Sequence, residues 1–258
     1  MNFIKNSFLY VVISTLLLSA LIYRFAMKDN KPHCDNFVVN VYLYIALSFS
    51  LIGLFIHAIN AFFYNRDTKL IPINQTFLFR SMYIFILYLV ISFGSLILLS
   101  IQDVFSKEGF LLNHALWIVF ISTLSLSTFP FFKSIEFSEY IGNAVYMTSI
   151  VFFLMSLMVY IFPGFFEKTY KIAIIALLIA LITIILIEVF VSYTRNSKFN
   201  RGMYYAVLVV FSLLVSYDTS RMFQYAKQCV DSPNYPKIST RQTLNIINLF
   251  QNFLIRRR

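Results

Sequence analysis

Long apolar runs, each close to the length that crosses a lipid bilayer, recur along almost the whole chain. A helix needs about 20 residues to span the ~30 Å hydrocarbon core. Only 12% of the residues are charged, whereas soluble domains usually carry about 25%. The alternating strands of about ten residues that build a membrane barrel are absent from the sequence. The chain is therefore predicted to be all-α, a polytopic bundle of membrane helices.

Eight apolar segments are expected to form this bundle. The first, about 7–27, lacks a small-residue cleavage site and is interpreted as a membrane anchor within residues 1–30, not as a signal peptide. No polar stretch is long enough to fold alone, so residues 37–258 are predicted to form one membrane-embedded domain. Its seven helices are expected at about 38–63, 77–101, 114–132, 143–162, 171–193, from 203 into the 220s, and 241–255.

The charges and cysteines do not fix the orientation of these helices. With eight crossings, eleven Lys and Arg residues fall on the N-terminal side and ten on the other, so the positive-inside rule does not choose. Cys34 and Cys229 lie in different predicted loops. They would pair only if the loops share a side of the membrane, and two separate thiols are the simpler expectation.

Polar side chains inside the last two apolar segments are the candidate functional residues. Asp218 stands at the end of an unbroken apolar run. One stripe of amides marks the last segment: Gln242, Asn245, Asn248 and Asn252. Because polar groups are expensive in a bilayer, both features favour a functional interpretation. The last segment is also too short and polar to face lipid all round, so it is expected inside the bundle.

Simpler explanations exist for each polar residue. Asp218 either faces a partner inside the bundle or ends the membrane run at the interface, where Arg221 one turn later can pair with it. His57 and Asn60 form either a proton-sensing pair or an interfacial histidine beside an amide. Glu188, the acid of segment 171–193, is expected near the far interface and in reach of water, with a buried ligand as the alternative.

Two short motifs carry a resemblance to a known family. Residues 215–221, VSYDTSR, contain Tyr217, Asp218 and Thr219, which resemble the Tyr-Asp-Thr signature of the Bax inhibitor-1 (transmembrane Bax inhibitor motif) family. Residues 244–250, LNIINLF, resemble that family's final-helix motif, Leu-Asp-x-Ile-Asn-Leu-Phe, with Asn245 in place of the aspartate. The resemblance covers about residues 38–255, and the N-terminal helix is extra.

The resemblance implies a calcium leak channel gated by two aspartates that share a proton. Like charges held close raise one pKa, so such a pair senses pH near neutrality. Here an amide faces Asp218 instead, and an amide does not titrate. We therefore expect a fixed latch and an impaired pH switch. The implied ion pathway or latch consists of Tyr217, Asp218, Thr219, Arg221, Asn245 and Asn248.

Other chemistry finds little support in the sequence. One central acid and the histidines His33, His57 and His114 do not make a protease, so the chain is not expected to be an enzyme. No metal or phosphate-binding motif indicates a cofactor. Tight calcium binding needs six to eight oxygens, so only transient Ca²⁺ contact is expected. The basic residues are scattered among loops, and nucleic acid is not an expected partner.

A second hypothesis makes the chain a structural or accessory subunit of a larger membrane assembly. The missing aspartate, the extra helix and the abundance of Phe and Tyr, which pack well against lipid and other subunits, favour it. The sequence has 30 Phe and 17 Tyr but only 6 Gly and 6 Pro, a bias typical of A/T-rich genomes of organelles, parasites or large viruses. The mitochondrial inner membrane, with a respiratory complex as partner, and an endoplasmic-reticulum-type membrane are the expected locations.

Overall fold

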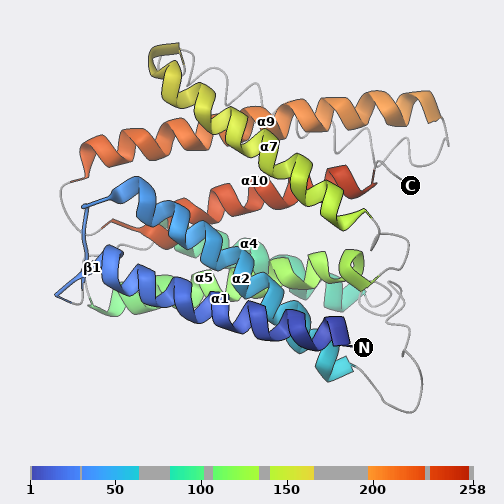
Figure 1. Cartoon of the computed structure of the whole chain (residues 1–258), viewed down its shortest axis with the longest axis horizontal. Helices are drawn as coiled ribbons and strands as arrows, with labels where there is room; N and C mark the ends of the chain where they lie inside the picture. Colours follow the sequence, from blue (N-terminus) through green and yellow to red (C-terminus); the bar gives the residue numbers. More distant parts are fainter. Residues whose placement is uncertain are drawn as a thin grey trace. The chain divides into compact units, whose positions relative to one another are not determined.

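The structure is a computed structural model of the 258-residue chain, and it describes residues 2–29, 31–63, 82–101, 107–133, 140–165, 197–229 and 233–255. Apart from one short hairpin, the elements in these ranges are α-helices (Figure 1). The predicted all-α bundle of membrane helices is confirmed. The predicted segment 171–193, with Glu188, lies outside the described residues.

The described helices fall into two units, which are taken separately. The first unit, 1–130 with 229–240, holds α1 (Asn2–Ala26), α2 (Phe37–Phe63), α4 (Met82–Ile101) and most of α5 (Lys107–Lys133). The second, 131–228 with 241–258, holds α7 (Ile141–Ile161) and α9 (Ser197–Gln228). The last helix, α10 (Tyr235–Ile255), begins in the first unit and continues into the second. The division into an anchor at 1–30 and a bundle at 37–258 stays a prediction.

Five of the described helices are long and apolar enough to cross a membrane. Their spans are Phe8–Ala26, Phe37–Ile59, Gly109–Phe129, Ile141–Ile161 and Tyr205–Gln228. A shorter apolar stretch, Ile86–Ile101, lies in α4. Large apolar side chains cover the outer faces of these helices, which is the pattern of a surface that meets lipid. The chain is thus a multi-pass membrane protein.

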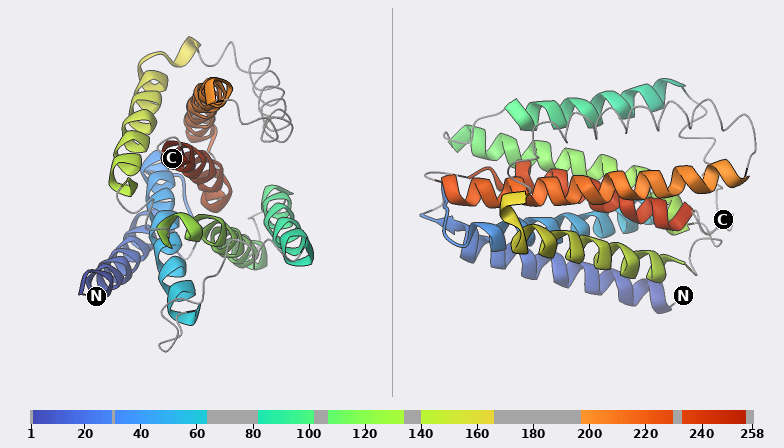
Figure 2. Two further views of the ribbon diagram at one scale, coloured as in Figure 1. Left: turned by 90° about the vertical axis from the view of Figure 1, so that its right-hand side faces the viewer. Right: turned by 90° about the horizontal axis from the view of Figure 1, so that it is seen from above.

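The N-terminal helix packs along α2, as Figure 1 and the end-on view of Figure 2 both show. Small and hydroxylated residues line the seam. The Ser50 hydroxyl lies 2.8 Å from that of Ser14 and 2.7 Å from that of Thr15. At Gly53 an added Cβ would lie 3.4 Å from a methyl group of Val11. Close approach through small residues is a common way for membrane helices to associate, because lipid tails provide no hydrophobic driving force between them.

A two-stranded hairpin joins these two helices. The strands β1 (Met27–Lys28) and β2 (Lys31–Pro32) pair in antiparallel register. Asp29 and Asn36 adopt positive φ angles of 52° and 54°, a conformation that Asp and Asn accept more readily than most residues. Asp29 follows β1 directly, and Asn36 directly precedes α2.

Three helices begin six or seven residues earlier than the apolar pattern predicted. α5 begins at Lys107, not 114; α9 at Ser197, not 203; and α10 at Tyr235, not 241. Apolar runs mark only the part of a helix inside the hydrocarbon core, whereas helices continue as polar turns into the headgroup region. The predicted loop 229–239 is therefore wrong from Tyr235 onward. Pro236 fits there because proline is tolerated in the first turn of a helix.

Candidate functional site

The side chains of Asp218 and Asn245 meet between α9 and α10. The Nδ2 atom of Asn245 donates a hydrogen bond of 2.6 Å to Oδ2 of Asp218. The predicted contact between these two residues is therefore present. Asn245 is buried, with 6% of its surface exposed, so its amide has few alternatives to this carboxylate. The role of the contact as a latch or ion pathway stays a prediction.

The two residues match in depth along their helices. Asp218 lies ten residues before Gln228, the end of α9, and Asn245 lies ten residues after Tyr235, the start of α10. At 1.5 Å per residue each distance is about 15 Å. α9 continues for nearly three turns beyond Asp218, and the alternative that Asp218 ends the membrane run at the interface stays a prediction.

A second polar contact lies beside the first. Gln242, one turn before Asn245, donates from Nε2 to the Thr219 hydroxyl at 2.9 Å. The Ser156 hydroxyl of α7 approaches Thr219 at 3.5 Å. Oε1 of Gln242 is buried and has no hydrogen-bond partner within the described ranges. Gln242 and Asn245, the first two members of the amide stripe, thus both contact α9.

Two arginines lie close enough to Asp218 to affect its carboxylate. Arg241 and Arg221 both interact electrostatically with Asp218. The Arg221 guanidinium also lies 5.4 Å from the centre of the Tyr225 ring, a cation–π arrangement. Arg241 was missed by the sequence analysis, which looked for partners within one turn of α9. Its position one turn before Asn245, on the same face of α10, is the signal that points to it.

The other predicted site residues are placed as follows. Tyr217 and Asn248 are partly exposed, each within one turn of the central pair. The partly exposed His57 meets the ring of Phe8 at 5.7 Å between centroids; the side chain of its predicted partner, Asn60, lies outside the described set. In the described part of the chain, no three His, Cys, Asp or Glu side chains cluster to hold a metal ion.

The first turn of α10 is the centre of a buried network that sequence reasoning did not find. Oη of Tyr235 donates to the backbone carbonyl of His33 and accepts from Nδ2 of Asn40 at 3.1 Å. The Tyr235 ring stacks on Tyr44 with centroids 5.5 Å apart. Oη of Tyr44 in turn lies 2.9 Å from Nε2 of His114. His114, the first residue of the predicted segment 114–132, lies well inside α5, which begins at Lys107.

Two further contacts tie this turn to neighbouring helices. Nδ2 of Asn234 donates to Oδ1 of Asn113 in α5 at 3.0 Å, and the Lys237 ammonium donates to the Ser100 carbonyl in the last turn of α4. These residues lie far apart in sequence. Their partners follow no local spacing rule, and this is why a pattern-based reading does not reveal them.

Tyr235 lies outside the spanning segments and has a perturbed acidity. Burial raises the pKa of its hydroxyl from 10.0 to about 12; the hydrogen bond from Asn40 lowers it, and the negative charge of Asp35 adds to the rise. The neutral phenol is thus the form that the fold requires, because its O–H donates a hydrogen bond to the backbone carbonyl of His33.

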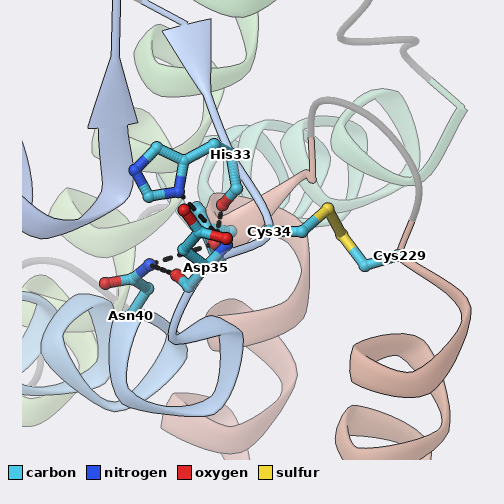
Figure 3. The surroundings of a disulfide bond; sticks show 6 residues. His33, Cys34, Asp35, Asn40 and Cys229 are labelled. Atoms are coloured by element: carbon cyan, nitrogen blue, oxygen red, sulfur yellow. Dashed lines mark hydrogen bonds between the residues drawn. A yellow bond between two sulfur atoms is a disulfide. The ribbon is translucent and has the colours of Figure 1, made fainter.

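Cys34 and Cys229 form a disulfide, with Cα atoms 5.8 Å apart (Figure 3). The expectation of two separate thiols is wrong. Cys34 lies between the end of the hairpin at Pro32 and the start of α2, and Cys229 directly follows α9. The sequence could not decide this, because 195 residues separate the two cysteines and only the tertiary fold brings their loops together.

Comparison with known proteins agrees with the geometry. A family model described as "Inhibitor of apoptosis-promoting Bax1" matches residues 34–256. The match includes both helices of the candidate site and begins at the disulfide cysteine, after α1. Among curated proteins none gives a significant match.

Proposed function

The chain belongs to the Bax inhibitor-1 family, and on this premise we propose that it is a calcium-leak-type membrane protein whose pH switch is impaired. The contact that supports the proposal is the hydrogen bond of 2.6 Å from Asn245 to Asp218. It joins α9 and α10 at the two motif positions that the family resemblance assigns to the paired acids. Asp218 is the acidic partner of this latch, and Asn245 is the neutral one.

The chemistry of the pair explains the loss of pH control. Two carboxylates at hydrogen-bond distance are held together by a shared proton and repel each other once it leaves. An amide donates its own hydrogen to the carboxylate, and it does so whether or not the other carboxylate oxygen is protonated. The Asp218–Asn245 contact therefore persists through a titration that would separate two acids.

Oxygen atoms near the latch suit a passing cation. The carboxylate of Asp218, the hydroxyl of Thr219 and Oε1 of Gln242 occupy neighbouring positions on the two helices. Calcium prefers six to eight oxygens and usually several carboxylates. One carboxylate with two neutral oxygens supports brief contact with Ca²⁺ during permeation, not tight binding of the ion. The positive charges of Arg221 and Arg241 also oppose retention of a cation.

Restoring the second acid tests the proposal. The purified protein is reconstituted in liposomes that contain a calcium indicator, and flux is measured from about pH 6 to about pH 8, the range expected for a coupled pair. We expect a nearly flat response from the natural chain. Asn245→Asp should introduce a dependence of up to about tenfold per pH unit, the limit for one titrating proton.

Matched variants separate the switch from a general effect of charge. Asn252→Asp adds one acid to the same helix about two turns from the latch and should leave the response flat. The proposal fails if the natural chain responds steeply near neutrality and Asp218→Asn abolishes that response. It also fails if no preparation conducts calcium above empty liposomes.

The second candidate function is an accessory subunit of a larger complex, in the mitochondrial inner membrane or an endoplasmic-reticulum-type membrane. The exposure of α1 favours it: large apolar side chains such as Leu9, Tyr10 and Leu16 are exposed, so the face of this extra helix that does not contact α2 is available to lipid or another subunit. Gentle detergent extraction followed by native electrophoresis and mass spectrometry distinguishes the two. A complex of many subunits supports the accessory role, and a monomer or small homo-oligomer supports the channel.

A further inference from the structure

The disulfide carries information about compartment and orientation that charge does not. Cys34 and Cys229 lie in the connections α1–α2 and α9–α10, so both connections must face the same side of the membrane. Structural disulfides persist in oxidising compartments and are rare where thiols are kept reduced. We propose that these two connections face an oxidising compartment, and that Cys34 and Cys229 are the substrate of a disulfide-donating oxidoreductase there.

Hydrogen bonds that do not involve sulfur already hold the two connections together. Tyr235 donates to the carbonyl of His33, the residue before Cys34. Nδ2 of Asn40 bridges Tyr235 and the Asp35 carbonyl, at 3.1 and 2.9 Å. Figure 3 shows Asn40 and Asp35 beside the bond. The fold therefore brings the two thiols together before oxidation, so their pairing follows from the contacts between the two connections.

The number of membrane crossings between the two cysteines agrees with their lying on the same side of the membrane. Between the two cysteines the described helices α2, α4, α5, α7 and α9 give five crossings when α4 is counted. The sequence predicts one more at 171–193, which makes six. An even number returns the chain to the side from which it started, as the disulfide requires.

The orientation of the ends follows. α1 precedes the Cys34 connection, so the N-terminal end of α1 lies on the opposite, reducing side. α10 carries the last predicted membrane segment, 241–255, which returns the chain across the membrane once more. The C-terminal end of α10 is therefore on the reducing side too.

The chemistry of bond formation is a thiol–disulfide exchange. The thiolate of one cysteine attacks the disulfide of the oxidoreductase and forms a mixed disulfide, and the second cysteine then displaces the enzyme. Cys34 and Cys229 together lose two protons and two electrons. The disulfide of the partner accepts them and becomes two thiols, so no other oxidant is needed.

Counting thiols in the native membrane tests the oxidation state. Membranes are quenched with acid, free thiols are blocked with N-ethylmaleimide, and the full-length protein is reduced and labelled with polyethylene-glycol maleimide. Because the chain has 2 cysteines, we expect two adducts after reduction and none when reduction is omitted. In Cys34→Ser, reduction should make no difference, because Cys229 has lost its partner. Two thiols blocked before reduction in the natural chain would overturn the proposal.

Protease accessibility in sealed vesicles with the cytosolic or matrix face outside tests the orientation. One epitope tag is placed after residue 258 and another, in a separate variant, within the hairpin turn after Asp29. We expect cleavage of the C-terminal tag in sealed vesicles and cleavage of the hairpin tag only after detergent. The reverse pattern, or equal cleavage of both tags, contradicts the proposed orientation even if the disulfide is present.

Discussion

At the scale of single residues, position 245 carries an amide where the family motif has an acid. The resemblance placed an aspartate in the family motif where this chain has Asn245, and the structure places that amide 2.6 Å from Asp218. The helices therefore keep their contact point while one of the two titrating groups is lost. The neighbouring Gln242–Thr219 bond, of 2.9 Å, holds the same pair of helices without any charge.

The Gln242–Thr219 bond should contribute measurably to stability. We expect a double-mutant cycle with Gln242→Leu and Thr219→Val to give a coupling of about 0.6 kcal/mol, the average for hydrogen bonds between membrane helices. The free energies of unfolding are measured by titration from mild detergent into sodium dodecyl sulfate. Additive effects of the two substitutions would show that the contact contributes nothing.

Tyr235 should make stability fall at high pH. Its pKa is about 12 in the fold and about 10 when unfolded, so the stabilisation is complete below pH 10. It is lost as the pH rises through the folded pKa, because the unfolded chain releases the proton first. From about pH 9 to about pH 11 the natural chain should lose about 1 kcal/mol more than Tyr235→Phe.

Thermal unfolding in detergent as a function of pH measures this difference. Tyr205→Phe is the matched control, because Tyr205 is an exposed tyrosine; it should follow the natural chain. Parallel curves for the natural chain and Tyr235→Phe would contradict the assigned acidity. At neutral pH, Tyr235→Phe should itself cost about 1–3 kcal/mol, since the hydrogen bond to His33 is lost.

At the scale of elements, the contact between α1 and α2 depends on backbone proximity. Ser14, Thr15 and Ser50 share hydrogen bonds across the seam, and Gly53 faces Val11 where a methyl group would just make ordinary contact. Helix α1 is the part that lies outside the family match. Its position therefore rests on this seam and on the hairpin that follows it.

A graded pair of substitutions at Gly53 tests the seam. Gly53→Ala should be tolerated, because its Cβ would lie 3.4 Å from Val11. Gly53→Leu should push α1 away and cost about 1–3 kcal/mol, the usual range for overpacking. Thermal stability of the purified protein in detergent is the measurement. Equal stability of the two variants would show that α1 does not approach α2 at this point.

At the scale of the whole molecule, the disulfide is the longest-range covalent constraint. It closes a loop with a sequence separation of 195 residues. Cross-links that close long loops restrict the unfolded chain and typically stabilise a protein by about 2–4 kcal/mol. It also joins the hairpin after α1 to the connection between the two helices that carry Asp218 and Asn245.

Removing the disulfide should therefore lower stability without abolishing the fold. We expect Cys34→Ser with Cys229→Ser to lose about 2–4 kcal/mol, because the hydrogen bonds around Tyr235 remain. The unfolding curve of the natural chain, but not of the double variant, should shift when a reductant is added. A shift of the same size in both would assign the effect of the reductant to something other than this bond.

The sequence by itself determined the class of the fold and the chemistry of the central pair. Apolar runs of membrane length and a low content of charge specify helices that cross a bilayer, because unpaired backbone groups are too costly there. The amide stripe of α10 has helical periodicity, so its members share one face of the helix. The partner of Asn245, Asp218, followed from the resemblance together with that stripe.

Only the tertiary structure decided which distant residues meet. The Cys34–Cys229 bond, the contacts of Tyr235 with His33, Asn40 and Tyr44, and the charge of Arg241 beside Asp218 join segments with no periodic relation. Helix ends also extended beyond the apolar pattern, since hydropathy reports burial in lipid and not backbone hydrogen bonding. The spacing of residues along one helix follows from the helical repeat and from the solvent that each face meets. Contacts between distant residues depend on how the helices pack. No local spacing in a single sequence encodes that packing.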